Sequence, residues 1–383
     1  MIGNENLLSF ELIDEIDVNL KIRNNKLTIN VKDSEFNFMT LFKISRKIRS
    51  FVNNYSLNKE IIITINTNEI IFSDFSLYML FESLLYFLCK NSKFKKIKFK
   101  NKKSKVFLEN DLENSIVFRN INNFITREEY MKEFEKLNIS LTNFRKIVKY
   151  EKDNNEITSI LYSELNVFLK TFKIQEYFKE QFIETIVELV SNANEHAKVD
   201  CLLDIRIDDV VNKITEKDFY NISVSIINFS NVLLGSGIRK NFKNKNIKIG
   251  FLKELEIAYK NHSYFFNEEY TEDDFFNISA FQWRFSGRND IIEDNGGTGL
   301  TTLIRFLIEA SELDSCYVFS GNTFIIFKKE FLVENEKKYI GFNKEQNYLN
   351  YPPDSSCVLK LPFFLNGTLY NFNFIVSKEE EYE

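Results

Sequence analysis

The sequence predicts an α/β protein of two domains. Its 383 residues exceed what one small hydrophobic core usually holds, so the length favours two domains of roughly 100–200 residues each. Short β-branched runs alternate with helical patterns at the beginning of the chain and again from Leu202 onward, whereas the part between them reads as mainly helical. We therefore expect a small α/β domain at 1–125, a helical connector at 126–150 and a larger α/β domain at 151–383.

The elements of the first domain follow from turn residues and periodicity. Asn24-Asn25 separates two β-branched runs and predicts a β-hairpin, because Asn tolerates the positive φ of tight turns. A long apolar stretch interrupted only by Glu82 predicts a buried helix. Strands are expected over 18–23, 27–31, 60–65 and 96–99, and helices over 36–52 and 75–89.

Composition and charge exclude several classes of protein. Hydrophobic residues make up 44% and charged residues 27%, which excludes wholesale disorder and a collagen-like chain. Four scattered cysteines without a C-x-x-C pair and two histidines indicate neither a disulfide framework nor a Cys/His zinc site. The apolar stretch 75–89 is too short to cross about 30 Å of hydrocarbon, and the N-terminus lacks the pattern of a signal peptide, so we expect a cytoplasmic protein without a membrane partner.

A polar stripe on one predicted helix is the first candidate for chemistry. Glu184, Glu188, Asn192 and His196 follow one another at a spacing of four, which places them on one face of the helix over 182–197. A carboxylate and a carboxamide one turn apart suit a general base at Glu188 and a Mg²⁺ ligand at Asn192. The alternative interpretation is the solvated face of an amphipathic helix.

A glycine cluster is the second candidate. Glycine is scarce, with 11 residues in all and only Gly3 before position 235, so the run Gly296-Gly297-Thr298-Gly299 indicates a special backbone requirement. The run leads directly into an amphipathic helix, and a glycine-rich helix N-terminus binds phosphate through its N–H groups. Hydroxyl donors are expected at Thr298, Thr301 and Thr302. The alternative is a turn with Thr298 as N-cap, and the spacing fits neither a P-loop nor a dinucleotide fingerprint.

Together the two segments resemble a known superfamily. Glu188-x-x-x-Asn192-Ala193-x-x-His196-Ala197 is similar to the N box, and Gly296-Gly-Thr-Gly-Leu300 to the G2 box, of the GHKL ATPases, named for DNA gyrase, a heat-shock chaperone, histidine kinases and a mismatch-repair ATPase. The form of the first motif is nearest the anti-sigma-factor serine kinase branch. The resemblance spans roughly residues 150–365 and implies a GHKL-type α/β sandwich, the Bergerat-like ATP-binding fold, with ATP and Mg²⁺ held between helices and a mixed sheet.

The resemblance also implies roles for single residues. It makes Glu188 the general base, Asn192 the Mg²⁺ ligand and His196 a neighbour of the nucleotide. It assigns the triphosphate contacts to Gly297, Thr298, Gly299 and, from a lid-like stretch over 286–290, Arg288. The third motif departs from the family, because Asn228 stands where an Asp receives the adenine amino group and Ser230 replaces a glycine. An Asn carbonyl accepts that hydrogen bond without charge assistance, and Gly235-Ser236-Gly237 is an alternative loop.

Two function classes remain open at this point. One is a Mg²⁺-dependent ATPase or a protein serine kinase-like enzyme, with Glu188 activating water or a protein hydroxyl. The other is a non-catalytic switch in which bound ATP orders a lid and regulates a protein partner or a second copy of the chain. Glu188 favours the first class and the altered third motif favours the second.

The sequence contains three weaker signals. Eight lysines between Lys93 and Lys105 alternate with apolar residues; they suit a nucleic-acid contact, but the protection of an exposed edge strand is the favoured interpretation. Residues 61–80 resemble the strand–loop–helix of STAS domains, in which a serine near the helix start can be phosphorylated; Ser73 lies at about that place, although a helix N-cap is its favoured interpretation. His262 is expected to pack or lie on the surface rather than to act in catalysis.

Overall fold

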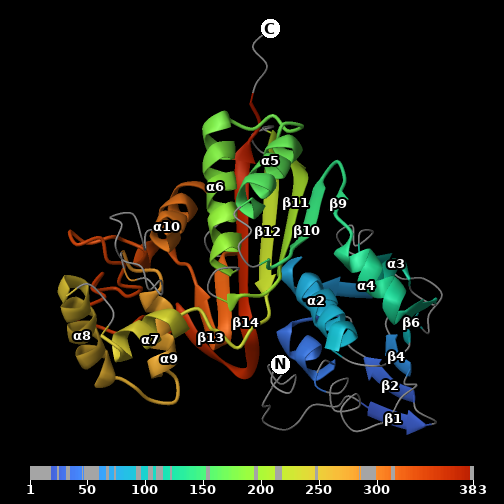
Figure 1. Ribbon diagram of the computed structural model, residues 1–383, viewed down its shortest axis with the longest axis horizontal. Coiled ribbons are helices and arrows are strands. Elements are labelled where there is room, and N and C mark those ends of the chain that lie inside the picture. The colour runs from blue at the N-terminus through green and yellow to red at the C-terminus, as the bar shows by residue number, and fades with distance from the viewer. Residues whose placement is uncertain are drawn as a thin grey trace. The chain divides into compact units, whose positions relative to one another are not determined.

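The computed structural model divides the chain into two compact units, Met1–Leu137 and Asn138–Glu383 (Figure 1). The residues that the structure describes are 19–23, 26–31, 35–44, 46, 60–65, 69–72, 75–91, 96–101, 107–108, 115–120, 123–151, 156–193, 197–211, 218–245, 249–283, 285, 299–311 and 315–379.

The first unit contains a five-stranded sheet, and the expected strands are confirmed within it. Its order is β1 (Asn19–Arg23), β2 (Lys26–Val31), β4 (Glu60–Ile65), β6 (Lys96–Asn101) and β8 (Phe124–Thr126). The β1–β2 and β6–β8 pairs are antiparallel, whereas β2, β4 and β6 run parallel. A smaller parallel sheet joins β3 (Glu35–Phe36), β5 (Glu69–Phe72) and β7 (Phe107–Leu108).

Helices supply the core of this unit. The described helices are α2 (Phe75–Asn91), α3 (Ile116–Arg119), α4 (Arg127–Glu135) and a helical segment over 38–44. The helix expected over 36–52 therefore begins at residue 38, because Phe36 belongs to β3. The described side chains from Ser76 to Tyr86 are all buried, as their largely apolar composition requires. The single carboxylate among them, Glu82, accepts hydrogen bonds from the Ser115 hydroxyl at 2.6 Å and the Val117 N–H at 3.1 Å.

The second unit is built on a six-stranded sheet. The order is β13 (Tyr317–Ile326), β14 (Val358–Ser377), β12 (Asp218–Asn228), β11 (Cys201–Val211), β10 (Asn143–Val148) and β9 (Asn138–Ile139). Every neighbouring pair is antiparallel, which differs from the mixed sheet that the family resemblance implies. The α/β class is confirmed for the described residues.

The helical interpretation of 126–150 is wrong for its second half. Only α4 is helical there, and β9 and β10 are strands of the second sheet. Arg145 and Lys146 interrupt the apolar run of β10 and disguise its alternation. The Arg145 side chain is nevertheless buried, 3.9 Å from the Asp204 carboxylate on β11, so a buried charge pair replaces the apolar residue that a sequence pattern would show.

Three helices pack on one face of the second sheet. They are α5 (Ile157–Leu169), α6 (Glu176–Asn192) and α10 (Gly299–Ala310), with α7 (Ser236–Lys243), α8 (Ile249–Ser263) and α9 (Glu272–Ser279) beside the β13 edge (Figure 1). The Phe374 ring of β14 lies 5.6 Å from the Phe182 ring of α6 and 5.2 Å from the Phe306 ring of α10. These rings join both helices to the sheet.

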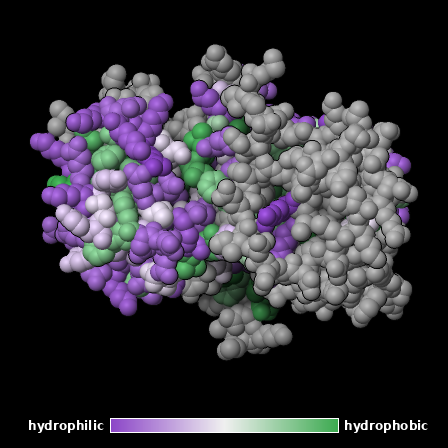
Figure 2. All heavy atoms as spheres, turned by 90° about the horizontal axis from the view of Figure 1, so that it is seen from below, coloured by the Kyte–Doolittle hydropathy of each residue, from purple (hydrophilic) through white to green (hydrophobic). Residues whose placement is uncertain are grey.

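The surface around α7, α8 and α9 is mainly hydrophilic with small hydrophobic patches on the face drawn in Figure 2. Within the part of the chain that the structure describes, none of the helices combines the length and apolarity needed to cross a membrane.

Candidate functional site

The end of α6 and the end of β12 lie at the same end of the second unit (Figure 1). The chain leaves α6 at Asn192 and enters β11 at Cys201, which pairs directly with Asn228. The N-terminal half of α6 contacts the C-terminal half of α10, with 5.4 Å between the Phe178 and Phe306 rings. The first turn of α10 therefore points toward the same end as the last turn of α6 (Figure 1).

Glu188 and Asn192 form a hydrogen-bonded pair on the last turns of α6. The Asn192 side-chain amide donates to Glu188 Oε1 at 3.3 Å, and both side chains are half-buried. Glu184, one turn earlier on the same stripe, is exposed. The opposite face of the helix, with Ile183 and Ile186, is buried in the core. Along the described part of the stripe, exposure therefore decreases from Glu184 to Glu188 and Asn192, the predicted base and Mg²⁺ ligand.

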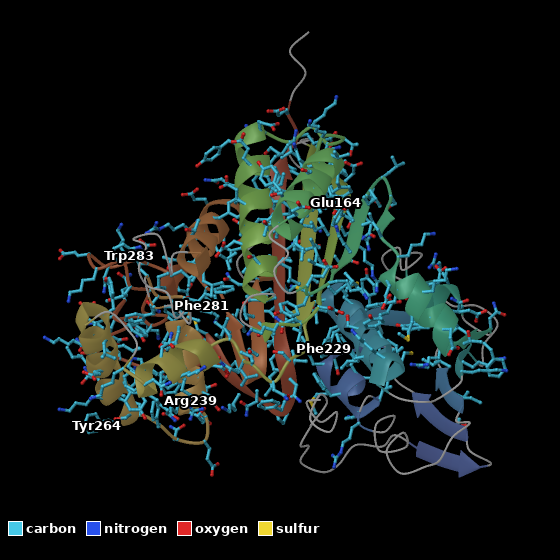
Figure 3. The ribbon with its side chains drawn as sticks, in the orientation of Figure 1. Glu164, Phe229, Arg239, Tyr264, Phe281 and Trp283 are labelled. Atoms are coloured by element: carbon cyan, nitrogen blue, oxygen red, sulfur yellow. The ribbon has the colours of Figure 1, made fainter. Side chains whose placement is uncertain are left out.

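Asn228 is the last residue of β12 and lies on the face of the sheet that the helices cover. It follows Val224 and Ile226 at alternate positions of β12, and those two residues belong to the core under the helices, so Asn228 lies on the helix-covered face. Its side chain is only 5% exposed, and Oδ1 accepts a hydrogen bond from the Thr368 N–H at 3.2 Å. Phe229, which follows it, marks this end of β12 in Figure 3.

The neighbouring strand requires glycine next to Asn228. Gly367 has φ +131°, and a Cβ atom there would lie 2.0 Å from the Asn228 carbonyl oxygen. Both the dihedral angle and the close approach exclude an ordinary side chain. On the far side of Thr368, the Ser320 hydroxyl lies 3.0 Å from the Thr368 hydroxyl. A small polar row therefore crosses three strands.

The loop after β12 is fixed by side-chain acceptors. Four consecutive backbone N–H groups donate to side-chain oxygens at 2.9–3.1 Å: Val232 to Ser230, Leu233 to Ser236, Leu234 to Ser320 and Gly235 to Asn277. Because these donors are already satisfied, the loop around Gly235 does not offer them to an anion. Gly235 is needed for packing instead, since a Cβ there would lie 2.3 Å from the Phe276 carbonyl carbon.

A buried polar network supports this loop from α9. Asn277 accepts from the Gly235 N–H and donates to the Thr323 hydroxyl at 2.9 Å, and Thr323 donates to Asp274 Oδ1 at 2.5 Å. Asp274 Oδ2 accepts from the Lys360 ammonium at 3.0 Å and from the Thr271 N–H at 2.7 Å. Sequence reasoning missed these residues. The spacing Thr271-x-x-Asp274 is the signal that predicts the beginning of α9, because it forms a capping box there.

The remaining predicted site residues divide into two groups. Gly299 is the first residue of α10, whereas His196, Arg288, Gly297 and Thr298 lie outside the described residues. The expectation that Thr301 contacts phosphate is wrong: the residue is buried, and its hydroxyl donates to the Phe281 carbonyl at 3.3 Å (Phe281 is labelled in Figure 3). Thr302 is exposed on α10, and Ser73 lies outside the described residues.

His262 belongs to the core rather than to this site. Its Nδ1 lies 2.6 Å from the Tyr270 hydroxyl and its Nε2 lies 2.6 Å from the Tyr348 carbonyl oxygen. Burial lowers its pKa to about 4 against the partial compensation of the Tyr348 carbonyl. The imidazole is therefore neutral at pH 7, donating from Nε2 and accepting at Nδ1. This agrees with the expected packing role.

The site contains few groups that bind a metal ion. Among the described residues, no cluster of three or more His, Cys, Asp and Glu side chains could hold one. Asn192 offers a single amide oxygen, a hard donor of the kind that Mg²⁺ accepts, and Mg²⁺ commonly takes its other ligands from water and from substrate phosphates.

Comparisons of the chain with protein-family models, with curated protein sequences and with solved structures find no match.

Proposed function

We propose that the second unit binds ATP with Mg²⁺ in the manner of a GHKL ATPase and that Glu188 is the general base of a phosphoryl-transfer or hydrolysis reaction. The observation that carries the proposal is the hydrogen-bonded pair of Glu188 and Asn192 at 3.3 Å. The pair lies on the half-buried end of a helix whose chain continues into the strand opposite Asn228. A half-buried carboxylate that is hydrogen-bonded to a carboxamide is a more specific indication of a functional site than an exposed polar helix face.

The orientation of Asn192 supports a metal role. Its NH₂ group is directed to Glu188, so its oxygen is not part of that hydrogen bond. An amide oxygen has two lone pairs and suits a hard cation. When bound, Mg²⁺ neutralises charge on the phosphates. The hydrogen bond to Glu188 would fix the Asn192 side chain that holds the Mg²⁺ ion.

The beginning of α10 supports a phosphate role. This helix starts at Gly299, directly after the predicted phosphate loop, and its first-turn N–H groups and dipole favour an anion at that end. With Thr301 bonded to Phe281, backbone groups supply this recognition rather than that hydroxyl.

In the enzymatic form of the proposal, Glu188 accepts a proton from a water molecule or a protein hydroxyl as its oxygen attacks the terminal phosphate. General-base catalysis of this kind contributes about 10²–10⁴-fold to a rate. Most of the remaining catalysis in phosphoryl transfer comes from positioning and electrostatic stabilisation of the transferred group.

A second candidate function, a non-catalytic ATP-dependent switch, has its own supporting observation. The loop after β12 has four satisfied N–H groups, and the neutral Asn228 replaces the family's Asp. A rigid loop and a weaker nucleobase contact suit reversible, nucleotide-dependent regulation of a partner better than rapid turnover. Both candidates share the bound nucleotide and differ in whether Glu188 moves a proton.

Calorimetric titration of the full chain with ATP, with and without Mg²⁺, tests the shared step. We expect binding that depends on Mg²⁺ and a raised melting temperature, because a ligand of the folded state stabilises it. Asn192→Ala should remove most of the Mg²⁺ dependence. Asn166→Ala on α5 is the matched control, since Asn166 is also a half-buried helical asparagine and should leave binding unchanged. A silent titration and an unchanged melting temperature at millimolar MgATP would refute the proposal.

A further inference from the structure

The five-stranded sheet of the first unit has two chemically different faces. The strand register aligns one set of alternate residues that is apolar except for a single Asn at the end of β6: Leu20, Ile22, Leu27, Ile29, Val31, Ile61, Ile63, Ile65, Ile97, Phe99, Asn101 and Ile125. Where burial is described on this face, Ile97 is 0% and Ile125 5% exposed. The face is therefore covered at these two described positions.

Among the charged residues, basic ones predominate at the alternate positions of the other face. The same register aligns six basic residues and one acidic residue there: Lys21, Arg23, Lys26, Lys96, Lys98 and Lys100, with Glu60. The whole chain, by contrast, has 50 basic and 55 acidic residues. A sheet face that is only solvated normally mixes the two signs, so this local bias points to an anionic partner.

The topology removes the simpler explanation of the lysines. Lysines often protect an exposed edge strand from pairing, which is the interpretation that the sequence favours. However, β6 pairs with β4 on one side and with β8 on the other, so Lys96 and Lys98 lie in the interior of the sheet rather than at its edge. Edge protection therefore does not account for them.

An aromatic side chain lies among these lysines. Phe124 of β8 is opposite Lys98 of β6, and the residue is 46% exposed. The ammonium group of Lys98 lies 4.3 Å from the ring centroid and that of Lys96 lies 5.4 Å from it. A nucleobase that stacks on this ring would bring its own phosphate close to these two cations. Base stacking on an exposed aromatic residue and phosphate contacts from lysines are the two components of single-strand recognition.

We propose that this face of the first unit binds single-stranded nucleic acid, with a base stacked on Phe124 and phosphates at Lys96 and Lys98. Alternate residues of a strand are about 7 Å apart, which suits successive phosphates of an extended single strand. A double-stranded nucleic acid is too stiff and too wide to bring one of its bases onto the Phe124 ring. The proposal uses a different unit from the ATP site and does not depend on it.

Fluorescence anisotropy of the full chain with fluorescein-labelled oligo(U) and oligo(dT) 20-mers tests the proposal. We expect binding that weakens steeply with salt. Lys96→Gln with Lys98→Gln should lower affinity about tenfold near 0.1 M salt and reduce the log–log salt slope by about 1.4, the value for two phosphate contacts on a single strand. Lys253→Gln with Lys260→Gln, two exposed lysines of α8, is the control with the same change of charge and should leave binding unchanged.

Aromatic substitutions separate stacking from simple charge attraction. Phe124→Ala should lower affinity fivefold or more, the loss expected when one stacked base loses its aromatic partner, and Phe124→Trp should restore it. Phe265→Ala is the control, because Phe265 is 44% exposed but lies after α8. The proposal is overturned if oligonucleotides do not bind at 50 mM salt, if the Lys96/Lys98 variant binds as the wild type does, if a duplex competes equally well, or if phosphatidylserine vesicles bind through the same residues while oligonucleotides do not.

Discussion

The side-chain oxygen of Asn228 accepts a hydrogen bond from the backbone N–H of Thr368 at 3.2 Å. This bond uses one of the two lone pairs of the amide oxygen, so the side chain keeps one neutral acceptor position beside its NH₂ donor. In the proposed site, the adenine amino group donates to that neutral oxygen, whereas a guanine carbonyl accepts from the NH₂ group.

Asn228→Asp should therefore tighten ATP binding and increase its preference over GTP. One carboxylate oxygen can keep the Thr368 contact while the other accepts from the adenine amino group. Charged hydrogen bonds contribute about 1.5–3 kcal/mol and neutral ones about 0.5–1.5 kcal/mol, so the gain should be about 1 kcal/mol, or several-fold in affinity. Titrations of both proteins with ATP and GTP measure it. Asn166→Asp on α5 makes the same chemical change elsewhere, and equal affinities in all three proteins would place the purine away from Asn228.

Glu188→Gln should strongly reduce turnover and keep nucleotide binding. The substituted amide preserves an oxygen for the Asn192 contact but cannot accept a proton, so the rate should fall about 10²–10⁴-fold. Steady-state phosphate release and calorimetric ATP binding measure the two quantities separately. Glu184→Gln, one turn earlier and exposed, removes the same charge and should behave as the wild type.

A wild type that binds ATP without measurable turnover would instead support the switch. Bound nucleotide would then have to change the conformation or the partner binding of the chain, which limited proteolysis with and without MgATP can detect. A rate that falls equally in the Glu184 and Glu188 variants would contradict the base assignment, because it would indicate a general effect of charge on this helix.

Gly367→Ala should destabilise the second unit and weaken nucleotide binding together. The new methyl group would meet the Asn228 carbonyl oxygen at 2.0 Å in a backbone conformation that alanine avoids, so β14 must move away from β12. Strain of this kind costs at least about 2 kcal/mol. Urea unfolding measures it. Gly237→Ala within α7 is the contrasting control, because alanine is favoured over glycine in a helix by up to about 1 kcal/mol.

Local elements could be predicted from the sequence, whereas their partners could not. The hairpin around Asn24-Asn25, the helix of Glu188 and the strand that ends at Asn228 follow from periodicity and turn residues. The insertion of β14 between β12 and β13 brings Thr368 to Asn228 across 140 positions of the chain, and no local pattern carries that information. A strand whose charged residue is buried against another charge, as in β10, is hidden for the same reason.

The lysines of β6 also show that a sequence pattern does not reveal which strands pair. Their number and alternation are evident in the sequence, but the choice between an edge strand and an interior strand depends on the pairing of β8 with β6. The Asp274 and Asn277 network likewise depends on Thr323 and Lys360, which are contributed by two distant strands. The structural role of such a residue therefore depends on long-range strand pairing, whereas the local sequence pattern shows only its position in a strand or helix.

His262 should make the stability of the second unit fall in mild acid. Its pKa is lowered by burial to about 4 in the folded chain, against an ordinary value of 6.5. His262 in the unfolded chain therefore binds a proton below about pH 6.5, whereas His262 in the folded chain binds it only below about pH 4. At about 1.36 kcal/mol per pH unit, the loss in the free energy of unfolding should approach about 3 kcal/mol at about pH 4. Urea unfolding of the wild type and of His262→Gln between pH 7 and pH 4 isolates this residue, because other groups titrate equally in both. The glutamine can still donate to Tyr348 and accept from Tyr270, and the wild type's advantage should shrink as the pH falls. A difference that stays constant across this range would show that His262 is protonated as easily in the folded chain as in the unfolded one.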